Sequence, residues 1–379
     1  MQMKRSRPRF LQRLALNVHA RYRHTQARLH ELTYLFWECT LRCNLKCLHC
    51  GSDCLAQSNV HDMPLEDFLR VVDEIGPICD RAKTIIVLTG GEPLMRNDLD
   101  RCGAAFEERG HPWGMVSNGY ILSQDRLRSL LANGLNTLTI SLDGLEDSHN
   151  WLRGRDDSYE RALDAIRAAI AAEELVFDVV TCVNQKNFDE LPALRDMLGE
   201  MGLTRWRLFT IFPKGRASDN ELLDVTNEQF RQLMEFILET RDEGTIQASY
   251  SCEGFLGPYE GKVREGFFWC RAGINVGSVL ADGSISACPS LRGDYIQGDI
   301  YRGSFVDVWN NRFQVMRDRA WTKTGICAEC DAYKWCEGNG LHLRDEQTGH
   351  LLRCHYHMLE GDSAPTVTSE KRRGEETTD

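Results

Sequence analysis

The chain has 379 residues and a formal net charge of −11, and its 42% hydrophobic and 27% charged residues are typical of a globular protein. No apolar run approaches the roughly 20 residues that a membrane-spanning helix requires, and no signal peptide is recognisable, so we expect a cytoplasmic protein. Fifteen cysteines are too many for ordinary core positions. In a reducing compartment they indicate metal or cluster ligation rather than disulfides.

Charge is distributed unevenly along the chain. Residues 1–30 hold eight Lys or Arg and no acid, whereas the remainder has 37 basic against 56 acidic residues, which argues against nucleic-acid binding. In the basic segment apolar residues recur every fourth position, at Phe10, Leu14, Val18 and Tyr22. This spacing predicts an amphipathic helix within residues 1–32 that docks on the acidic body. Capture of an acidic peptide and contact with a membrane surface are the alternatives, and membrane contact is not expected.

From residue 33 to residue 245, short β-rich runs alternate with longer amphipathic stretches. The predicted strands lie at 32–38, 84–89, 112–117, 136–142, 177–183 and 205–211, and helical patterns between and after them include 64–78, 123–134, 157–174 and 226–244. Six β/α units in series predict an α/β fold with parallel strands and outer helices, either a barrel or a doubly wound sheet. In both folds the loops after the strands carry function.

The loop after the first predicted strand is rich in cysteine. Only three of its five cysteines follow the order C-x3-C-x2-C, namely Cys43, Cys47 and Cys50. A cubane iron–sulfur cluster normally takes four thiolates, so three would leave one iron free for an outside ligand. A zinc site completed by Cys39 or Cys54 is the alternative.

The second predicted strand leads into Gly90, Gly91, Glu92 and Pro93. Two glycines let the backbone approach a ligand closely, and Glu92 offers an acceptor for an ammonium group. Together with the cysteine triplet, this turn resembles the radical S-adenosylmethionine (SAM) superfamily, whose two most diagnostic motifs these are. The resemblance covers residues 33–245. Further matches follow later strands, as in that family's partial (β/α)6 barrel: VSNG at 116–119, ISLDG at 140–144 and PKGR at 213–216.

The resemblance implies a [4Fe–4S] cluster on the three cysteines, with SAM bound to the fourth iron. It implies that the Gly90–Glu92 turn receives the methionyl ammonium, that Ser141 and Arg153 contact the carboxylate, and that Ser117 and Asn118 lie near the ribose or methionine portion. An electron from a flavodoxin- or ferredoxin-type donor would cleave SAM to a 5′-deoxyadenosyl radical, which abstracts hydrogen from a substrate.

Beyond residue 250 helical periodicity fades and cysteine becomes frequent, which predicts a smaller domain over 250–360 that is stabilised by bound metal. Its cysteines resemble the SPASM domain, the auxiliary-cluster extension of radical SAM enzymes. The resemblance implies one complete auxiliary cluster on Cys327, Cys330, Cys336 and Cys354, although four cysteines would also satisfy zinc. A polar, disordered tail is expected over 361–379.

A second auxiliary cluster would keep Cys270 and Cys288 but lose a ligand, because Gly340 stands where the family has a cysteine. Cys252 is an alternative ligand. Sulfatase-maturing relatives carry an aspartate directly after the cysteine that matches Cys288, and Pro289 stands here instead. We therefore do not expect formylglycine formation, and no catalytic base can be assigned.

These features predict a radical SAM/SPASM oxidoreductase that acts on a ribosomally made peptide. Only about thirty residues precede the first predicted strand, fewer than the leader-recognition domain of many such maturases needs, which weakens the expectation of a peptide substrate. A small-molecule or cofactor precursor is the alternative substrate. A non-catalytic iron–sulfur electron carrier or scaffold is the alternative from another class of protein.

Overall fold

The structure is a computed structural model, and it describes residues 8, 10–218, 220–251 and 253–360. The predicted tail at 361–379 and the alternative ligand Cys252 lie outside the described residues. No helix of the described ranges combines the length and the apolar character that crossing a bilayer requires.

One sheet organises the described chain, and seven parallel strands in sequential order form its main part. They are β1 (Tyr34–Thr40), β2 (Ile85–Gly90), β3 (Trp113–Ser117), β4 (Leu135–Ser141), β5 (Val176–Val183), β6 (Arg205–Thr210) and β7 (Gln247–Tyr250). The predicted α/β barrel with six strands is confirmed, and the seventh strand is added at its edge. The sequence missed β7 because its four residues, QASY, contain no run of large apolar side chains.

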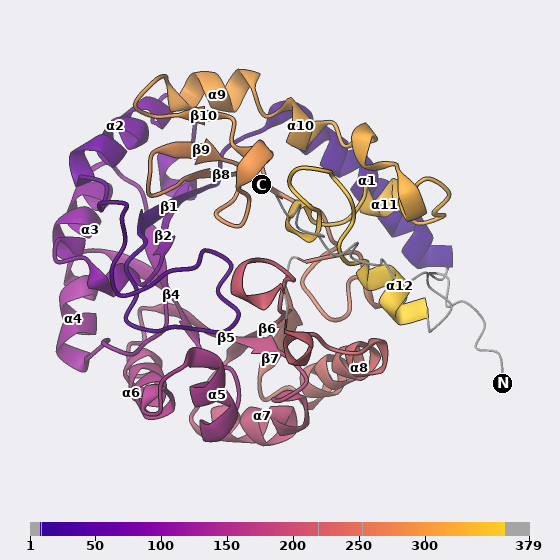
Figure 1. Cartoon of the computed structure of the whole chain (residues 1–379), viewed down its shortest axis with the longest axis horizontal. Coiled ribbons are helices and arrows are strands. Elements are labelled where there is room, and N and C mark those ends of the chain that lie inside the picture. The colour runs from indigo at the N-terminus through magenta and orange to yellow at the C-terminus, as the bar shows by residue number, and fades with distance from the viewer. Residues whose placement is uncertain (1–7, 9, 219, 252, 361–379) are drawn as a thin grey trace, which may run out of the picture.

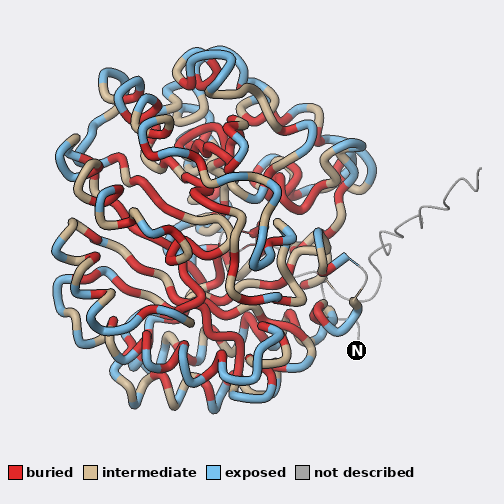
Figure 2. Tube along the Cα trace, turned by 60° about the vertical axis from the view of Figure 1, so that its left-hand side comes forward, coloured by how far each residue is buried: buried red, intermediate tan, exposed pale blue. Residues whose placement is uncertain are grey.

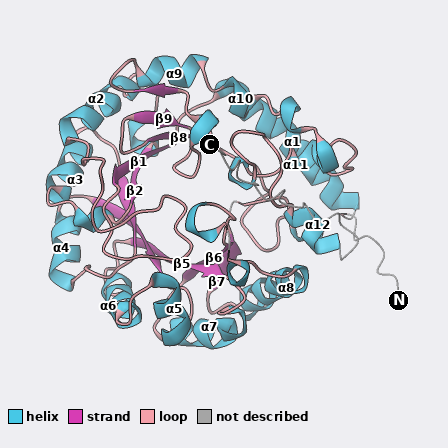
Figure 3. Ribbon diagram, in the orientation of Figure 1, coloured by secondary structure: helices cyan, strands magenta, loops and turns pink. Residues whose placement is uncertain are grey.

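Helices surround the strands on the outside (Figures 1 and 3). Around the barrel these are α2 (Leu65–Ile75), α3 (Leu99–Glu108), α4 (Gln124–Ala132), α5 (Glu146–Arg153), α6 (Ser158–Ile170), α7 (Leu191–Glu200) and α8 (Asn227–Glu243). Local chemistry sets the ends of α8. Thr226 and Gln229 form a capping box at its start, and Gly244 adopts a left-handed conformation, φ +76°, at its end.

The main core lies between the sheet and these helices. Trp37 on β1 stacks on Phe68 of α2 with ring centroids 4.3 Å apart, and Phe106 of α3 meets both rings edge-on. In Figure 2 the buried stretches accordingly lie in the interior, and the exposed ones follow the outer helix sides and loops. This aromatic packing fixes β1 and β2, the strands whose ends carry the cysteine loop and the glycine turn.

The C-terminal part of the chain continues the same sheet. β8 (Val276–Val279) pairs in parallel with β1, and the antiparallel strands β9 (Ser284–Ser286) and β10 (Gly298–Asp299) follow outward. Four helices complete this part: α9 (Phe305–Asn311), α10 (Gln314–Arg317), α11 (Tyr333–Cys336) and α12 (His355–Glu360). The sheet does not close on itself. In Figure 1, α10, α11 and α12 fill the sector between β10 and β7.

The N-terminal helix forms and docks on the body as predicted, as α1 (Phe10–Leu29), but it does not dock through the apolar residues whose spacing predicted it. Phe10 is 80% exposed and Val18 is 60% exposed, while the opposite face buries Leu16 and Arg23. Polar anchors decide this orientation, because the Arg23 guanidinium donates to the Trp335 carbonyl oxygen at 2.6 Å and pairs with Glu337. The periodicity of apolar residues therefore predicted the helix but not which of its faces contacts the body.

Candidate functional site

Three predicted cluster ligands lie together in the loop that follows β1. Cys43, Cys47 and Cys50 pack in one cluster with Leu45 and Cys54, and Cys43 and Cys47 are buried. Backbone hydrogen bonds tie this loop down, from Cys43 N to Leu55 O and from Leu48 N to Leu152 O, both 2.8 Å. The thiols are thus held at the carboxyl ends of the parallel strands, where α/β barrels carry their active sites.

Side chains from other loops hold the cysteine loop in place. The Arg216 side chain donates to the Cys47 carbonyl oxygen at 2.8 Å, and its backbone N–H donates to the Cys50 carbonyl oxygen at 3.1 Å. Arg153 Nη1 lies 3.7 Å from Cys47 Sγ, and Asn118 Nδ2 donates to Asn44 Oδ1 at 2.8 Å. Two guanidinium groups therefore lie beside thiols whose bound form is anionic, which suits a thiolate-ligated cluster.

The thiols of this loop differ in acidity. Burial raises the pKa of Cys43 to about 11, and it also raises the pKa of Cys47. A hydrogen bond from the Cys54 thiol lowers the pKa of Cys50. Among the residues that the structure describes, no three His, Cys, Asp or Glu side chains are arranged around one point as ligands of a single ion. A zinc ion requires its ligands around one point, whereas a cluster takes thiolates spaced around its own volume.

The glycine turn after β2 packs against the cysteine loop itself. Gly90 has φ +137°, and a Cβ there would lie 2.1 Å from the Thr40 carbonyl oxygen. A Cβ on Gly91 would lie 2.2 Å from the Arg42 carbonyl oxygen. The loop after β1 and the turn after β2 meet backbone to backbone, with Gly91 N donating to Thr40 O at 2.7 Å. Both glycines are required by this close approach within the chain, besides any approach to a ligand.

The structure brings the predicted site residues Glu92, Ser117 and Asn118 into contact with one another. The buried Glu92 carboxylate accepts hydrogen bonds from Ser117 Oγ and Asn118 N, both at 2.8 Å, and from Leu94 N at 3.1 Å. Burial raises the pKa of Glu92. The carboxylate thus joins the ends of β2 and β3. The expectation that it also receives the SAM ammonium remains a prediction.

Arg153 has a partner that the sequence did not reveal. Its guanidinium pairs with Asp143 at 2.6 Å, and Asp143 is fully buried after β4. Burial raises the pKa of Asp143, but Arg153, His49, His149 and the hydrogen bond from Cys182 N together outweigh burial, so the pKa is lowered overall. Ser141 ends β4 and is buried two residues earlier. Contact of Ser141 and Arg153 with the SAM carboxylate remains a prediction. The Arg153 guanidinium is already paired with Asp143 beside the cysteine loop.

A cavity of about 670 Å³ lies on the concave side of the sheet, below these residues. Its wall includes Val116, directly before Ser117, and Thr139, two residues before Ser141. It also includes the partly exposed ion pair of Arg207 and Asp178, whose members both bond to Thr139 Oγ1, at 2.9 and 2.7 Å. Further wall residues come from the start of the C-terminal part: Arg264, Glu265, Phe267, Phe268, Trp269 and Arg271.

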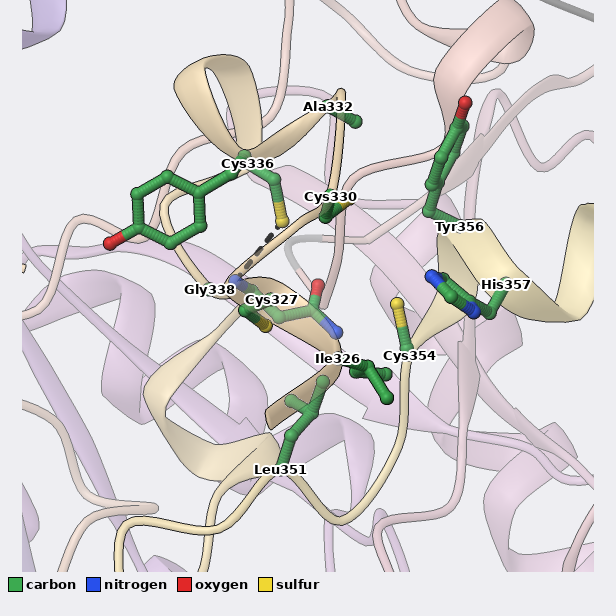
Figure 4. Close-up of a pocket in the computed structure, with 12 residues that line it drawn as sticks. Ile326, Cys327, Cys330, Ala332, Cys336, Gly338, Leu351, Cys354, Tyr356 and His357 are labelled. Carbon is green, nitrogen blue, oxygen red and sulfur yellow. Dashed lines mark hydrogen bonds between the residues drawn. The ribbon is translucent and has the colours of Figure 1, made fainter. Parts of the chain in front are cut away.

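The four predicted auxiliary ligands line one pocket in the C-terminal part (Figure 4). They are Cys327, Cys330, Cys336 and Cys354. Arg344 Nη2 lies 3.4 Å from Cys327 Sγ, and Asn339 N donates to Cys336 Sγ at 3.1 Å. Burial raises the pKa of Cys336 to about 12. Four thiols around one small space, with two donors aimed at sulfur, fit a cluster with a full set of protein ligands.

Among the described residues, Cys270 and Cys288 are not joined by further thiols in one pocket of the kind that the four other cysteines line. Cys270 and Cys288 are not among the residues that line the four-cysteine pocket, and both pack against the main core. At Gly340 a Cβ would lie 2.6 Å from the Glu253 carbonyl oxygen and 2.6 Å from the His342 ring. The space that a cysteine would need at residue 340 is therefore occupied by backbone and by an imidazole.

A buried polar cluster connects the cavity wall with the four-cysteine pocket. Tyr250, which lines the cavity, donates its hydroxyl to the Glu253 carboxylate and lies 3.1 Å from His355 Nε2. His355 directly follows Cys354 in the chain. Burial raises the pKa of Glu253 to about 7. A residue of the cavity wall thus contacts the sequence neighbour of a cysteine that lines the other pocket.

The protein is a parallel α/β barrel with three thiols at its strand ends and four more thiols in its C-terminal part. These features are those of an iron–sulfur protein of the α/β class. The sequence model of the radical SAM superfamily matches residues 37–198, and that of the iron–sulfur cluster-binding domain SPASM matches residues 270–331. The chain belongs to the radical SAM superfamily and carries a C-terminal SPASM domain. Cys336 and Cys354 lie beyond the SPASM match, and the structure brings them to the matched cysteines.

Related proteins with known names are similar over most of their length. The AdoMet-dependent heme synthase of Methanosarcina barkeri is 26% identical over 324 residues, covering 80% of this chain and 89% of the relative. The mycofactocin maturase MftC of Mycolicibacterium smegmatis is 27% identical over 352 residues, covering 89% and 85%. These relatives are enzymes, and so is this protein.

Solved structures share the fold. The anSMEcpe structure with bound AdoMet and Cp18Cys peptide matches with a TM-score of 0.68 at 18% identity, covering 87% of this chain and 94% of that one. The structure of Streptococcus suis SuiB bound to its precursor peptide SuiA matches with a TM-score of 0.67 at 17% identity, covering 86% and 76%. At these identities the similarity establishes the barrel with its C-terminal extension.

Sequence reasoning missed three residues that hold the site: Asp143, Arg216 and Arg292. Asp143 and Arg216 lie in ISLDG and PKGR, two motifs that follow strands, and a charged side chain in such a motif could have identified them as site residues. Arg292 is a third, because it bonds Glu38 and Ser52 and so links the SPASM domain to β1 and the cysteine loop. No local pattern marks Arg292, whose partners are more than 200 residues away.

Proposed function

We propose that this radical SAM enzyme modifies a peptide that it binds in the barrel cavity. The carrying observation is the position of that cavity, whose wall begins one residue from Ser117 and two residues from Ser141. A substrate in it would lie directly beneath the predicted SAM-binding residues. When bound, the [4Fe–4S] cluster and SAM supply a 5′-deoxyadenosyl radical that abstracts a hydrogen atom from substrate.

In this proposal the residues at the strand ends hold and orient the cofactors. Cys43, Cys47 and Cys50 would hold the cluster, while Arg153 and Arg216 offset the charge of its thiolates. Glu92 fixes the Ser117–Asn118 turn that would face SAM. Burial of this site excludes water and competing reductant from the reacting groups. A low-potential electron donor of the flavodoxin or ferredoxin type is part of the proposal.

The cavity wall supports a peptide substrate through its mixed chemistry. Arginines and carboxylates stand beside aromatic rings and the hydroxyls of Thr139 and Ser249, so the wall can bond main-chain amides, acidic side chains and aromatic side chains. Relatives add support, since a PqqA peptide cyclase of Rhizobium meliloti is 25% identical over 339 residues. Two solved structures of the same fold contain a bound peptide.

A tetrapyrrole is the second candidate substrate, for two reasons. The heme synthase and an Fe-coproporphyrin III synthase of Methanosarcina barkeri are 26% and 25% identical to this chain. Four arginines against two carboxylates line the cavity, and this excess suits a ligand that carries carboxylates. The wall arginines are Arg205, Arg207, Arg264 and Arg271.

The test is turnover of anaerobically reconstituted, reduced protein with SAM, with 5′-deoxyadenosine measured by mass spectrometry. Candidate precursor peptides from neighbouring genes and Fe-coproporphyrin III are supplied in parallel. A peptide that raises 5′-deoxyadenosine formation and changes mass supports the proposal, and a response to the porphyrin alone contradicts it. Arg207→Leu should abolish the response to substrate and leave the slow substrate-free cleavage of SAM intact, whereas Cys43→Ala should abolish both.

A further inference from the structure

The exposed side of α1 carries an apolar stripe that is densest from Phe10 to Val18. Six large apolar residues of this helix are more than half exposed: Phe10, Leu11, Leu14, Val18, Tyr22 and Leu29. At 3.6 residues per turn they fall within about one third of the helix circumference. The helix has 20 residues, so the stripe runs for about 30 Å along the surface. A stripe of this length is unusual on the surface of a globular domain.

The opposite side of α1 is fixed to the body by specific polar contacts. Gln12 donates to the carbonyl oxygens of Pro258 and Glu260 at 3.1 and 3.0 Å, and Asn17 accepts from the Trp335 indole at 2.9 Å. Arg23 is buried against α11. In Figure 1, α1 runs along the outer edge of the molecule beside α11. These contacts hold the helix in a defined orientation that turns the stripe outward.

Positive charge lies beside and within the stripe. Arg13, Arg21 and Arg28 are exposed on the same helix, next to the apolar residues. No acidic residue occurs before residue 31, although the rest of the chain carries an excess of 19 negative charges. The surface that fits this side is therefore apolar at depth and anionic at its boundary. Long arginine side chains can extend from an apolar layer to anionic headgroups.

We propose that α1 is an interfacial helix that docks the enzyme on an anionic lipid bilayer. A helix lying in the bilayer surface needs an apolar stripe without a matching groove, basic flanks and a fixed polar side, and α1 has all three. The membrane contact that the sequence did not lead us to expect follows from the exposure of the predicted apolar side. The proposal concerns location and is independent of which substrate the cavity binds.

Docking would also bring the barrel cavity close to the membrane. Tyr22 meets Trp269 with ring centroids 6.1 Å apart, and His19 meets Phe267 at 5.4 Å. Trp269 and Phe267 both line the cavity. A helix resting in the headgroup layer therefore places one cavity wall within a helix diameter of the bilayer, which favours a substrate that is itself held at a membrane.

Vesicle co-sedimentation of the full-length holoenzyme tests the proposal. Vesicles of phosphatidylcholine with 30% phosphatidylglycerol should bind the protein, and vesicles of phosphatidylcholine alone should bind it at least roughly tenfold more weakly. The triple variant Phe10→Ser, Leu14→Ser, Val18→Ser should lose binding to the anionic vesicles by at least roughly tenfold. The triple variant Arg13→Gln, Arg21→Gln, Arg28→Gln should bind more weakly and lose most of the salt dependence.

The matched control replaces three exposed apolar residues elsewhere, as Ile78→Ser, Leu222→Ser and Tyr301→Ser, and should bind like the wild type. Iron content and circular dichroism should be unchanged in all variants, which shows that they fold. Equal binding of the stripe variant and the control would overturn the proposal. So would a stripe-dependent dimer in sedimentation velocity, or binding of a polyglutamate peptide in place of vesicles.

Discussion

The two thiol sites of this protein are built in different ways. In the barrel, three cysteines share one loop, and that loop is held by side chains from elsewhere: Asn118 after β3, Arg153 at the end of α5, Arg216 after β6 and Arg292 in the SPASM domain. In the SPASM pocket, four cysteines come from residues 327–354, and the donors to sulfur, Asn339 and Arg344, lie in the same short segment.

This difference teaches how each site relates to its ligand. A loop that supplies three thiols and depends on distant anchors keeps one side open for another molecule. A pocket with four thiols and local anchors supplies a full ligand set from one segment and needs no outside ligand. Substitutions that remove a cysteine ligand or a distant anchoring side chain should therefore have different effects on iron content, stability and activity at the two sites.

The largest expected effect comes from removing ligands. Cys43→Ala with Cys47→Ala should lower iron by about four atoms per chain and abolish formation of 5′-deoxyadenosine. Cys327→Ala with Cys330→Ala should also lower iron by about four atoms but leave the SAM-dependent change in the spectrum of the remaining cluster. Iron analysis and absorption spectra on both variants check this. Loss of all iron from either variant would mean that the two sites are not separate.

The next effect is on stability, through Asp143. Arg153→Met leaves the fully buried Asp143 carboxylate without its partner and should lower the free energy of unfolding by about 3–5 kcal/mol. Denaturant unfolding of the apoprotein measures it. Arg155→Met, an exposed arginine two residues away, is the control and should change little. Full stability of Arg153→Met would show that the pair is not a structural element.

A distant anchor should matter less, and it should affect metal binding rather than folding. Arg216→Ala removes the donor to the Cys47 carbonyl oxygen and should lower the affinity of the barrel site for its cluster by about 10–100-fold. Timed iron release to a chelator detects this loss as a faster release of iron from the barrel site. The SPASM cluster of the same protein serves as the internal control. If Arg216→Ala accelerated iron release equally from both sites, the claim that distant anchors hold only the barrel site would be wrong.

The smallest expected effect concerns the missing cysteine. Gly340→Cys restores the family residue but forces its Cβ against the Glu253 carbonyl oxygen, so it should lower the free energy of unfolding by about 1–3 kcal/mol. It should not add iron. Gly303→Cys is the matched control, because no atom lies within 4 Å of a Cβ there. A gain of about four irons in Gly340→Cys would show instead that a second auxiliary site lacked only this ligand.

Particular residues show how far sequence reasoning reached. The six predicted strands form, and their ends bring Cys43, Glu92 and Ser117 to one end of the barrel, because parallel strands align their ends automatically. Arg153, at the end of α5, reaches the same cysteine loop. The pocket of Cys327, Cys330, Cys336 and Cys354 also follows from spacing, since its members are close in the chain. The partner of Arg153 and the exposed side of α1 did not follow, because both depend on which residues meet across the fold.

Local spacing by itself determined the strand–helix alternation, the cysteine triplet and the glycine turn, since each is encoded within a few adjacent residues. Tertiary structure alone decided that Glu92 bonds β3, that Arg216 and Arg292 hold the cysteine loop, and that α1 turns its apolar side outward. These outcomes depend on contacts between segments far apart in the chain, where a buried charge or carbonyl group must find a partner and the periodicity of one helix cannot say where that partner lies.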